Sequence, residues 1–426
     1  MTHHIAIIGG GIGGLCLAQG LRKAGCDVTV YERDRTPADR LQGYRVHIDP
    51  NGARALRDCL PDHLWRSFLD TTGRGGQDFG FLTEQLDLLT LIETPEAADP
   101  ADDHHSVSRI TLRQVLLSGL DDVVRFGKTY ERYERLPDGR VELFFADGTS
   151  ETADIVVAAD GGNSRVRRQY LPHAERVDTG ITTVAGKFPL TDETRKLLAP
   201  RLVDGPNSII PPKGIGLFCA PHDLSDLAPA TGGIGMTEQA SGIGVTELEG
   251  ALMDNTSSYV LWAVGAAAGR FPSDISEMSG QQLKDTVAQM IRSWHPDLRR
   301  MIDLSHPDTV SLLPIRTSIP IDPWPATNIT LLGDAIHSMT PMRGIGANTA
   351  LRDARLLCRA LTAGGDPIEA IAGYEAEMRE YGFAAVRDSL RSAQQFVGEN
   401  RIARMGFKSF LRLVHRIPSL KAKVFS

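Results

Sequence analysis

The stretch IAIIGGGIGGLCLAQGLRKAGCDVTVYERD, residues 5–34, decides the fold of this chain. Residues 5–8 form an apolar run typical of a buried strand, and residues 15–24 show the spacing of a helix. Between them lies a GxGxxG pattern, made by Gly9, Gly11 and Gly14. Such glycines allow a tight turn, a close approach of the backbone to a pyrophosphate and close packing of the helix on the strand. The pattern therefore predicts a dinucleotide-binding βαβ unit, with the helix N-terminus facing the phosphates.

An acidic residue follows the second predicted strand, residues 28–31. Glu32 stands where a carboxylate accepts hydrogen bonds from ribose hydroxyls and repels a 2′-phosphate. Arg33 beside it is a further candidate for cofactor binding. A lone GxGxxG would be weak evidence, but the strand, the helix and the acid at this spacing make the fingerprint specific. The motif by itself does not distinguish NAD from FAD.

The composition narrows the possible functions. A chain of 426 residues predicts two domains, and its net charge of −7 argues against a general nucleic-acid partner. The five cysteines are scattered without a CxxC or a Cys/His metal spacing, which predicts reduced thiols in the cytoplasm and no metal site. We expect neither a signal peptide nor a membrane span, because the start lacks a basic region and no apolar stretch is long enough.

Two further motifs follow along the chain. ADIVVAADGGNSRVRRQYL predicts a buried strand over residues 155–159 that ends at Asp160, before a helix start. NITLLGDAIHSMTPMRGIGANTALRDARLLCRAL predicts a strand over residues 329–332 that ends at Gly333 and Asp334. Residues 341–348 of that stretch then open a long helix.

In this order the three motifs resemble the signature of the class A FAD-dependent aromatic hydroxylases, the p-hydroxybenzoate hydroxylase-like flavoprotein monooxygenases. That signature is GxGxxG, then a DG motif, then a GD motif followed by PxxGxGxN. The resemblance spans essentially the whole chain, and within the family it is strongest to the shorter polyketide hydroxylases and the tetracycline-inactivating monooxygenases. It therefore favours FAD as the cofactor.

The resemblance implies a role in FAD binding for each motif. Glu32 would bind the adenosine ribose, Asp334 would bind the ribityl chain, and Asp160 would lie near the pyrophosphate. The segment VSRITLRQVLL matches the family's helix that carries flavin-contacting arginines, here Arg109 and Arg113. Arginine suits this place because its planar cation makes charge-assisted hydrogen bonds to phosphate.

The flavin ring would lie between two other segments. Arg45, in GYRVHIDPNG, matches the segment that passes beside the isoalloxazine. The loop and helix start beneath the ring would be formed by Pro341, Gly344, Gly346, Ala347 and Asn348. The glycines leave room for a planar ring, and the N-terminus of the following helix would stabilise the anion of a reduced flavin.

The resemblance implies an oxidoreductase, namely an NAD(P)H-consuming flavoprotein monooxygenase or hydroxylase of secondary metabolism or antibiotic chemistry. NAD(P)H would reduce FAD, O2 would add at flavin C4a to give a hydroperoxide, and its distal oxygen would pass to an aromatic or polycyclic polyketide-like molecule. The chain has no second strand–GxGxxG–helix unit, so NAD(P)H would bind transiently as a co-substrate. The expected partners are thus the small-molecule substrate and O2, with no nucleic acid and no membrane.

The implied fold class is α/β, with a Rossmann-like FAD-binding domain, a second, antiparallel-sheet substrate domain and a C-terminal helix. Strand-like segments separated by Gly and Pro support the second domain. The FAD-binding domain is expected at residues 1–75, 103–178 and 315–400. The substrate domain is expected at residues 76–102 and 179–314, and the amphipathic helix at residues 401–426.

The sequence names no catalytic side chain with certainty. Arg45 and His47, two residues apart on a predicted strand, are the candidates, but a structural role for His47 is favoured, since hydroxylation needs a base only if a phenolic proton must leave. His337 follows the GD motif and is expected to be structural. Trp262, in the predicted strand 259–265, is a candidate for the substrate pocket, although a tryptophan in a strand is more often core.

The last predicted helix is basic and amphipathic. Its apolar stripe is formed by Phe407, Phe410, Leu411 and Val414, with basic residues on another stripe. Such a helix can lie on a membrane, but packing of the stripe on the protein is the favoured interpretation. Pro418 is expected to end the helix.

Two other functions stay open at this point. Flavin-dependent halogenases share the fold, but they resemble one another in a W-x-W-x-I-P segment, and the four tryptophans here are isolated. A non-catalytic protein that binds flavin or shields a reactive ligand would also fit the motifs.

Overall fold

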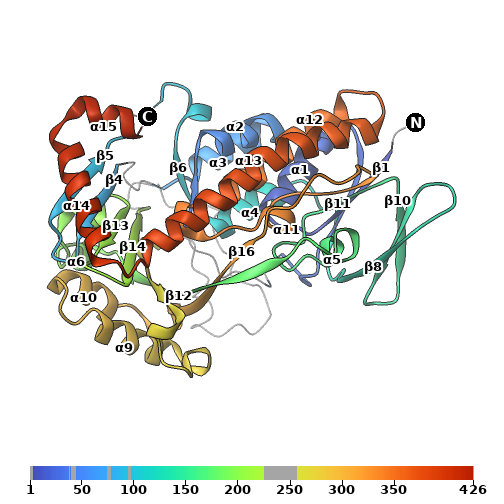
Figure 1. Ribbon diagram of the computed structural model, residues 1–426. Helices are drawn as coiled ribbons and strands as arrows, with labels where there is room; N and C mark the ends of the chain where they lie inside the picture. The colour runs from blue at the N-terminus through green and yellow to red at the C-terminus, as the bar shows by residue number, and fades with distance from the viewer. Residues whose placement is uncertain are drawn as a thin grey trace.

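The computed structural model describes residues 3–37, 39, 45–73, 78–94, 97–224 and 257–425. Two sheet-based units lie side by side, with the N-terminus at one end of the molecule and the last helices at the other (Figure 1). Helix α13 (Pro367–Phe396) runs from the first unit to the second. Its residue Met378 packs in the core around the first sheet, whereas Ala393 packs beside Ile181 and Ile315 of the second sheet.

The unit that contains the fingerprint is built on a parallel sheet. Its strands lie in the order β17–β11–β1–β2–β7, and all neighbours are parallel. They are β1 (His4–Ile8), β2 (Asp27–Tyr31), β7 (Val124–Arg125), β11 (Ile155–Ala158) and β17 (Ile329–Leu331). The strands predicted before the three motifs are thus confirmed. Because parallel strands end at one edge of their sheet, the three motif loops meet there.

Helices and two small sheets complete this unit. The helices are α1 (Ile12–Lys23), α2 (Pro50–Cys59), α3 (Asp62–Asp70), α4 (Arg109–Leu117), α5 (Arg165–Tyr170), α11 (Asp334–His337) and α12 (Gly346–Thr362). Strand β3 (Arg45–Ile48) pairs with β6 (His105–Ser108). A three-stranded antiparallel sheet is formed by β8 (Tyr130–Arg135), β9 (Val141–Phe145) and β10 (Ser150–Ala153).

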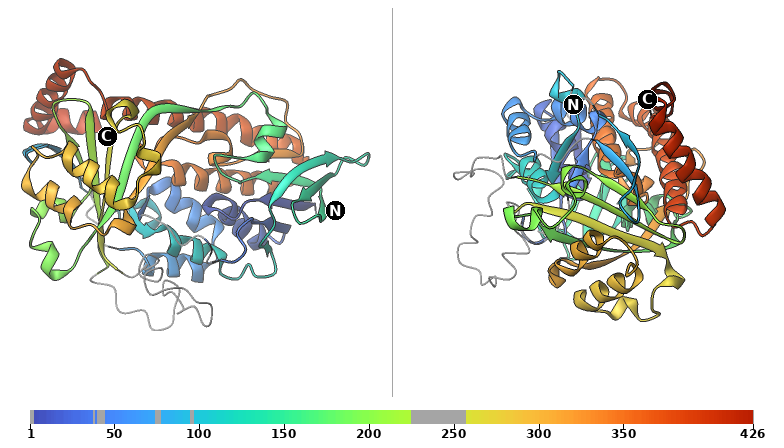
Figure 2. Two further views of the ribbon diagram at one scale, coloured as in Figure 1. Left: turned by 90° about the horizontal axis from the view of Figure 1, so that it is seen from below. Right: turned by 90° about the vertical axis from the view of Figure 1, so that its left-hand side faces the viewer.

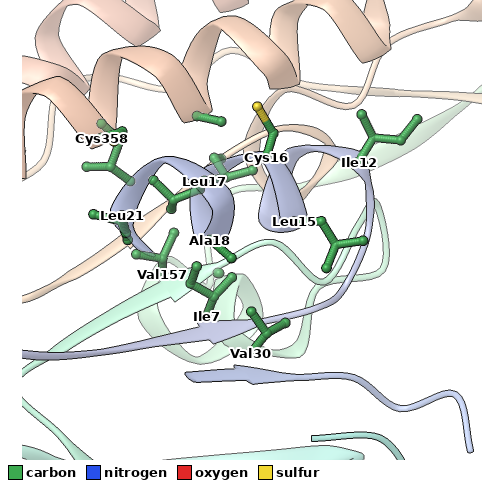
Figure 3. Packing of buried hydrophobic residues seen from close by; sticks show 14 of the residues in the cluster. Ile7, Ile12, Leu15, Cys16, Leu17, Ala18, Leu21, Val30, Val157 and Cys358 are labelled. Atoms are coloured by element: carbon green, nitrogen blue, oxygen red, sulfur yellow. The ribbon is translucent and has the colours of Figure 1, made fainter. Parts of the chain in front are cut away.

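Helix α1 is enclosed between the parallel sheet and α12. Figure 3 shows Ile7 and Val157 of the sheet below α1, with Cys358 of α12 on its other side. Two glycines set the distance between helix and strand. A Cβ on Gly14 would lie 2.2 Å from the carbonyl oxygen of Gly9, and Gly9 itself has a φ of +111°. The backbone contact required by the fingerprint therefore leaves no room for a side chain.

The second sheet has the order β16–β12–β15–β14–β13–β4–β5. Its strands are β4 (Phe79–Thr83), β5 (Leu88–Ile92), β12 (Arg176–Pro189), β13 (Asn207–Ile210), β14 (Ile215–His222), β15 (Tyr259–Ala267) and β16 (Ser311–Ser318). The sheet was expected to be antiparallel, but β13 and β4 are parallel. The reason is that β4 and β5 form a separate hairpin, supplied by an earlier chain segment, which extends the sheet beside β13.

Helices cover the outer face of this sheet. They are α9 (Gly280–Met290) and α10 (Pro296–Asp303), with the short α6 (Asp192–Arg195) and α7 (Pro200–Asp204) nearby. Figure 2 shows α9 and α10, in gold, on one side of the sheet. Strands β12 and β16 of this sheet run across the expected domain limits at residues 178 and 314. The expected limits stay a prediction.

The C-terminal segment forms two helices, α14 (Arg401–Arg416) and α15 (Pro418–Phe425). The first helix ends before Pro418, as predicted, but a second one starts there. Of the expected apolar stripe, Leu411 and Val414 are buried, whereas Phe407 and Phe410 are each 41% exposed. The predicted packing stripe is therefore only half correct, since the helix rests on a narrower face than its sequence pattern indicated.

We predict that Gly14→Ala destabilises the chain by about 1–3 kcal/mol, because its methyl group must separate α1 from the turn at Gly9. Gly11→Ala is the matched control, since no heavy atom lies within 4 Å of its added Cβ. Urea unfolding of the flavin-free chain measures both, without a contribution from cofactor affinity. Equal stability of the two variants would contradict the packing described above.

Candidate active site and cofactor cleft

Two cavities lie at the edge of the parallel sheet where the motif loops meet. The larger has a volume of about 1330 Å³ and extends to the second sheet, and the smaller has about 500 Å³. Both are lined by Gly11, Ile12, Arg109, Ala159 and Gly161. The fingerprint loop thus lies where the two cavities adjoin, which gives an elongated cleft.

Glu32 lies in the smaller cavity and is almost fully buried. Its Oε2 accepts a hydrogen bond from the Gly10 amide (2.6 Å) and its Oε1 accepts one from the Asp34 amide (2.9 Å). A carboxylate has about four lone-pair sites, so Glu32 can accept further bonds from a ligand. The exposed Arg33 lines the same cavity.

The two arginines of α4 differ in their surroundings. Arg109, the first residue of the helix, is exposed and lines both cavities. Arg113 lines the smaller one and donates to the carbonyl oxygens of Gly10 (3.2 Å) and Pro37 (2.8 Å). Its Nη2 lies 3.5 Å from Asp34 Oδ2. Arg113 therefore stabilises the fingerprint loop through these bonds, whereas the charge of Arg109 faces the cleft.

The DG and GD motifs place their acids on either side of this junction. Asp160 Oδ2 accepts the Arg165 amide (2.8 Å), and burial raises the pKa of Asp160. Its Oδ1 is buried with no hydrogen-bond partner in the part of the chain that the structure describes. Asp334 follows Gly333, whose φ is +61°, and its exposed side chain lines the larger cavity.

A buried polar network holds the GD turn. Asp353 Oδ2 on α12 accepts the Gly333 amide (2.7 Å) and lies 2.6 Å from His337 Nε2. Tyr381 of α13 donates its hydroxyl to Asp353 Oδ1. Burial lowers the pKa of His337, but the adjacent Asp353 carboxylate outweighs it and the pKa is raised. His337 lines neither cavity, so its contacts fit the structural role favoured from the sequence.

The loop before α12 has the expected placement, with one exception. Pro341, Gly344, Gly346 and Ala347 all line the larger cavity, and Gly344 has a φ of +64° with open space around it. Asn348 does not line it. Instead its Nδ2 donates to the His47 carbonyl (2.8 Å) and its Oδ1 accepts the Asp49 amide (3.0 Å). The Asn348 side chain thus links α12 to β3, and the expected role of Asn348 in cofactor binding stays a prediction.

Strand β3 brings a polar cluster to the larger cavity. Arg45 donates through Nε to Ser106 Oγ (2.7 Å), and His47 Nε2 lies 3.0 Å from His104 Nδ1. Burial and the charge of Arg45 lower the pKa of His47 to about 3, and burial also lowers that of His104. Burial lowers the pKa of Arg45 to about 10. At neutral pH this cluster therefore places the cation of Arg45 beside two neutral imidazoles.

Sequence reasoning missed His104 and Ser106. Both line the larger cavity, and β6 brings Ser106 opposite His47 across the two-stranded sheet. The only available signal was the HHSVS segment just before the arginine helix. The pairing of two segments about 60 residues apart is not visible in local spacing.

The second sheet supplies an apolar wall. The ring centroid of Phe79 lies 5.1 Å from that of Phe81 and 6.3 Å from that of Phe218, and all three side chains line the larger cavity. Trp262 does not. It is fully buried on the other face, where its Nε1 donates to Ser305 Oγ (2.7 Å). The substrate contact considered for Trp262 is therefore wrong, because alternation along β15 turns Leu261 and Ala263 to the cavity instead.

Comparison with known proteins agrees with this geometry. Residues 273–389 match the family described as "FAD binding domain", and residues 7–72 match "NAD(P)-binding Rossmann-like domain". A crystal structure of a protein from Photorhabdus luminescens, assigned as an FAD-containing monooxygenase, is 38% identical, with a TM-score of 0.81. It covers 93% of this chain, and this chain covers 98% of it.

Two curated proteins are also similar. A dual O-methyltransferase/FAD-dependent monooxygenase from Cercospora beticola is 32% identical, covering 88% of this chain and 44% of that protein. The chain thus spans less than half the length of this relative. The 6-hydroxynicotinate 3-monooxygenase of Pseudomonas fluorescens is 26% identical, covering 84% of this chain and 82% of that protein.

The chain therefore belongs to the FAD-dependent monooxygenases, in the class A flavin hydroxylase family. FAD is its cofactor, and NAD(P)H is typical of the family. Among the helices of the described residues, none combines the length and the hydropathy needed to cross a bilayer.

The His337–Asp353 pair predicts a pH dependence of stability. Because the pKa of His337 is raised in the folded chain, its stabilising contribution is complete below the ordinary value of 6.5 and is lost as the pH rises through the raised pKa. The free energy of unfolding of the native chain should therefore fall relative to that of His337→Gln from neutral to alkaline pH. Urea unfolding at several pH values measures this difference, and parallel curves would contradict a charged pair.

Proposed function

We propose that this protein is a monooxygenase that uses FAD, NAD(P)H and O2 to hydroxylate a flat aromatic molecule, with polycyclic polyketide-like compounds as the preferred class. One observation carries the proposal. A single cleft joins the fingerprint loop and Asp334 at one end to a wall of aromatic side chains at the other. A cofactor and an apolar substrate can therefore meet in it.

The residues of the cleft fit FAD. We assign the adenosine ribose to Glu32, the pyrophosphate to the α1 N-terminus with Arg109, and the ribityl chain to Asp334. Two features support a dinucleotide here. Asp334 makes no hydrogen bond or ion pair within the described residues, and Gly11 leaves its side of the cleft open. The glycine loop before α12 would lie under the flavin ring, beside Arg45.

The substrate class follows from the far wall. Phe79, Phe81 and Phe218 offer ring faces and edges for stacking on a planar molecule. The larger cavity also exceeds the 300–1000 Å³ range typical of a single ligand site (about 1330 Å³), which leaves space for a substrate beside the flavin. The Pseudomonas relative acts on a hydroxylated nitrogen heterocycle and the Cercospora relative is fused to an O-methyltransferase, which supports a phenol-like group on the substrate.

When bound, FAD supplies the reduction of O2 and the transfer of one oxygen atom to the substrate. The chain's own contribution is to orient the substrate, to exclude water with the aromatic wall and to hold the substrate oxygen. We propose that His47 hydrogen-bonds to the oxygen of the substrate hydroxyl, and that His104 fixes the orientation of the His47 ring. Both imidazoles are neutral at pH 7, and the 3.0 Å contact between His47 Nε2 and His104 Nδ1 leaves His47 Nδ1 available for the substrate.

Arg45 would favour the deprotonated substrate. Its pKa of about 10 keeps it cationic at neutral pH, and no described carboxylate forms an ion pair with it. A cation in a mostly apolar cavity stabilises a phenolate, whose higher electron density makes ring carbons more reactive toward an oxygen electrophile.

The proposed function is tested with the FAD-loaded protein and a panel of phenolic and polyketide compounds. Without oxygen, a true substrate should accelerate flavin reduction by NADPH or NADH. With isotopically labelled O2, mass spectrometry should find one labelled oxygen atom in the product. Hydrogen peroxide as the sole product with every compound would contradict the proposal, as would a halide-dependent product. A flavin that NAD(P)H never reduces would indicate a non-catalytic binding protein.

A pair of variants connects this activity to the assigned site. Asp334→Asn keeps the side-chain volume but removes the charge that would receive the ribityl hydroxyls, so the variant should be purified with less FAD. Asp322→Asn, at an exposed position before β17, is the control and should retain its flavin. Equal flavin content, measured from the visible absorbance of each protein, would remove Asp334 from the cofactor site.

We predict that His47→Gln lowers the rate of hydroxylation of a phenolic substrate by about 100-fold, because the glutamine amide does not reproduce the position of imidazole Nδ1 and the substrate is no longer held in its reactive orientation. FAD content should not change, and NAD(P)H consumption should continue with release of hydrogen peroxide. The ratio of product to NAD(P)H consumed measures this uncoupling. His63→Gln, on the exposed side of α3, is the control. Full coupling in His47→Gln would assign His47 a structural role.

A further inference from the structure

Helix α14 has apolar side chains on two opposite sides. On the inner side Leu411 and Val414 are buried, and Leu411 packs in a cluster with Leu89 of β5. On the outer side Ile402 and Leu413 lie three turns apart and are 81% and 50% exposed. A helix that needed only to rest on the protein would carry polar residues on the outer side.

The inner side is firmly fixed to the protein. Arg404 is 6% exposed and donates to the carbonyl oxygens of Pro211 (2.9 Å) and Ile215 (3.1 Å), and also to those of Gln395 and Phe396. These four bonds join the helix to the second sheet and to the end of α13. The outer apolar face is therefore held outward by the fold.

The outer face is defined here as Ile402, Met405, Phe410, Leu413 and Ile417, each at least 39% exposed. Arg401, Arg412 and Arg416 are exposed on the same helix and form no ion pair with any described residue. Every charged residue after Glu399 is basic, although the whole chain has a net charge of −7. The face thus combines apolar side chains with local positive charge.

Nearby acidic groups do not cancel this charge. Glu84 is paired with Lys408 (3.1 Å) and Glu93 with Lys421 (2.8 Å), while Glu399 is paired with Arg270 (2.5 Å). Each of these acids therefore already has a basic partner, and the exposed arginines keep their positive field.

We propose that the outer face of α14 docks on the surface of a bilayer that contains anionic phospholipids. Its apolar side chains would enter the boundary between headgroups and acyl chains, and its arginines would contact lipid phosphates. A second copy of the chain is a poorer fit, because a twofold contact would place arginines opposite arginines. The sequence favoured packing on the protein for this helix, but the structure shows that packing uses only the inner side.

The position of the helix suits this role. α14 and α15 lie at the end of the molecule away from the N-terminus, with α14 along the outside (Figures 1 and 2). Arg404 and Phe407 of α14 also line the larger cavity. A bilayer on the outer face would therefore be separated from the wall of the proposed active site by the single helix α14.

Flotation with vesicles tests the proposal on the FAD-loaded protein. The protein should float with vesicles of phosphatidylcholine and phosphatidylglycerol, should not float with phosphatidylcholine alone, and should be released by high salt. Ile402→Ser with Leu413→Ser should weaken binding at least about tenfold. Arg412→Gln with Arg416→Gln should weaken it about 25-fold, at roughly fivefold for each charge. Ile368→Ser, which removes a 44% exposed isoleucine at the start of α13, should bind as the native chain does.

Three results would overturn the proposal. They are no binding to anionic vesicles, equal binding to neutral vesicles, and equal binding of the double variants. Sedimentation velocity without lipid tests whether a second copy of the chain occupies the face instead. A native dimer that becomes a monomer in the double variant Ile402→Ser with Leu413→Ser would assign the face to that second copy. Retained flavin and an unchanged Tm establish that each variant is folded. None of these readouts depends on catalysis, so the failure of the proposed function would leave this test valid.

Discussion

The close backbone contact between the turn at Gly9 and the first turn of α1 at Gly14 is the constraint on which the cleft depends. It fixes the N-terminus of α1 at the carboxyl edge of the parallel sheet, and the DG and GD loops end at the same edge. The positive end of the helix dipole and the acids of these loops are thereby held around one elongated space. The rest of the architecture supports this arrangement or closes it from the other side.

Helix α12 does most of the positioning around the cleft. Through Asp353 it holds the amide of Gly333, and so presents Asp334 to the larger cavity. In its first turn, Asn348 holds the backbone of His47 and Asp49. A single helix therefore sets the separation between the GD motif and the strand that carries the polar cluster. A rigid element between two sites fixes their distance better than two loops would.

Burial gives the polar cluster its chemical character. Imidazoles removed from water beside a cation lose their proton, so His47 is neutral, whereas Arg45 has a guanidinium pKa high enough to stay charged. A neutral acceptor and a fixed cation can then share one apolar cavity. The same contrast between buried and exposed sides recurs on α14, where buried Arg404 fastens the helix and the exposed arginines remain available for a ligand.

The sequence by itself determined the parallel sheet, the place of all three motifs and the family, because these features depend on spacing within about 30 residues. It also pointed to Glu32 and Asp334, which lie in the cleft. Only the tertiary structure decided that Trp262 faces the core, that His104 joins His47, and that the last helix has two apolar faces. Those outcomes depend on which strands pair and on which elements cover each face of a sheet or helix. Such contacts join segments that are distant in the sequence, so they leave no pattern in the local order of residues.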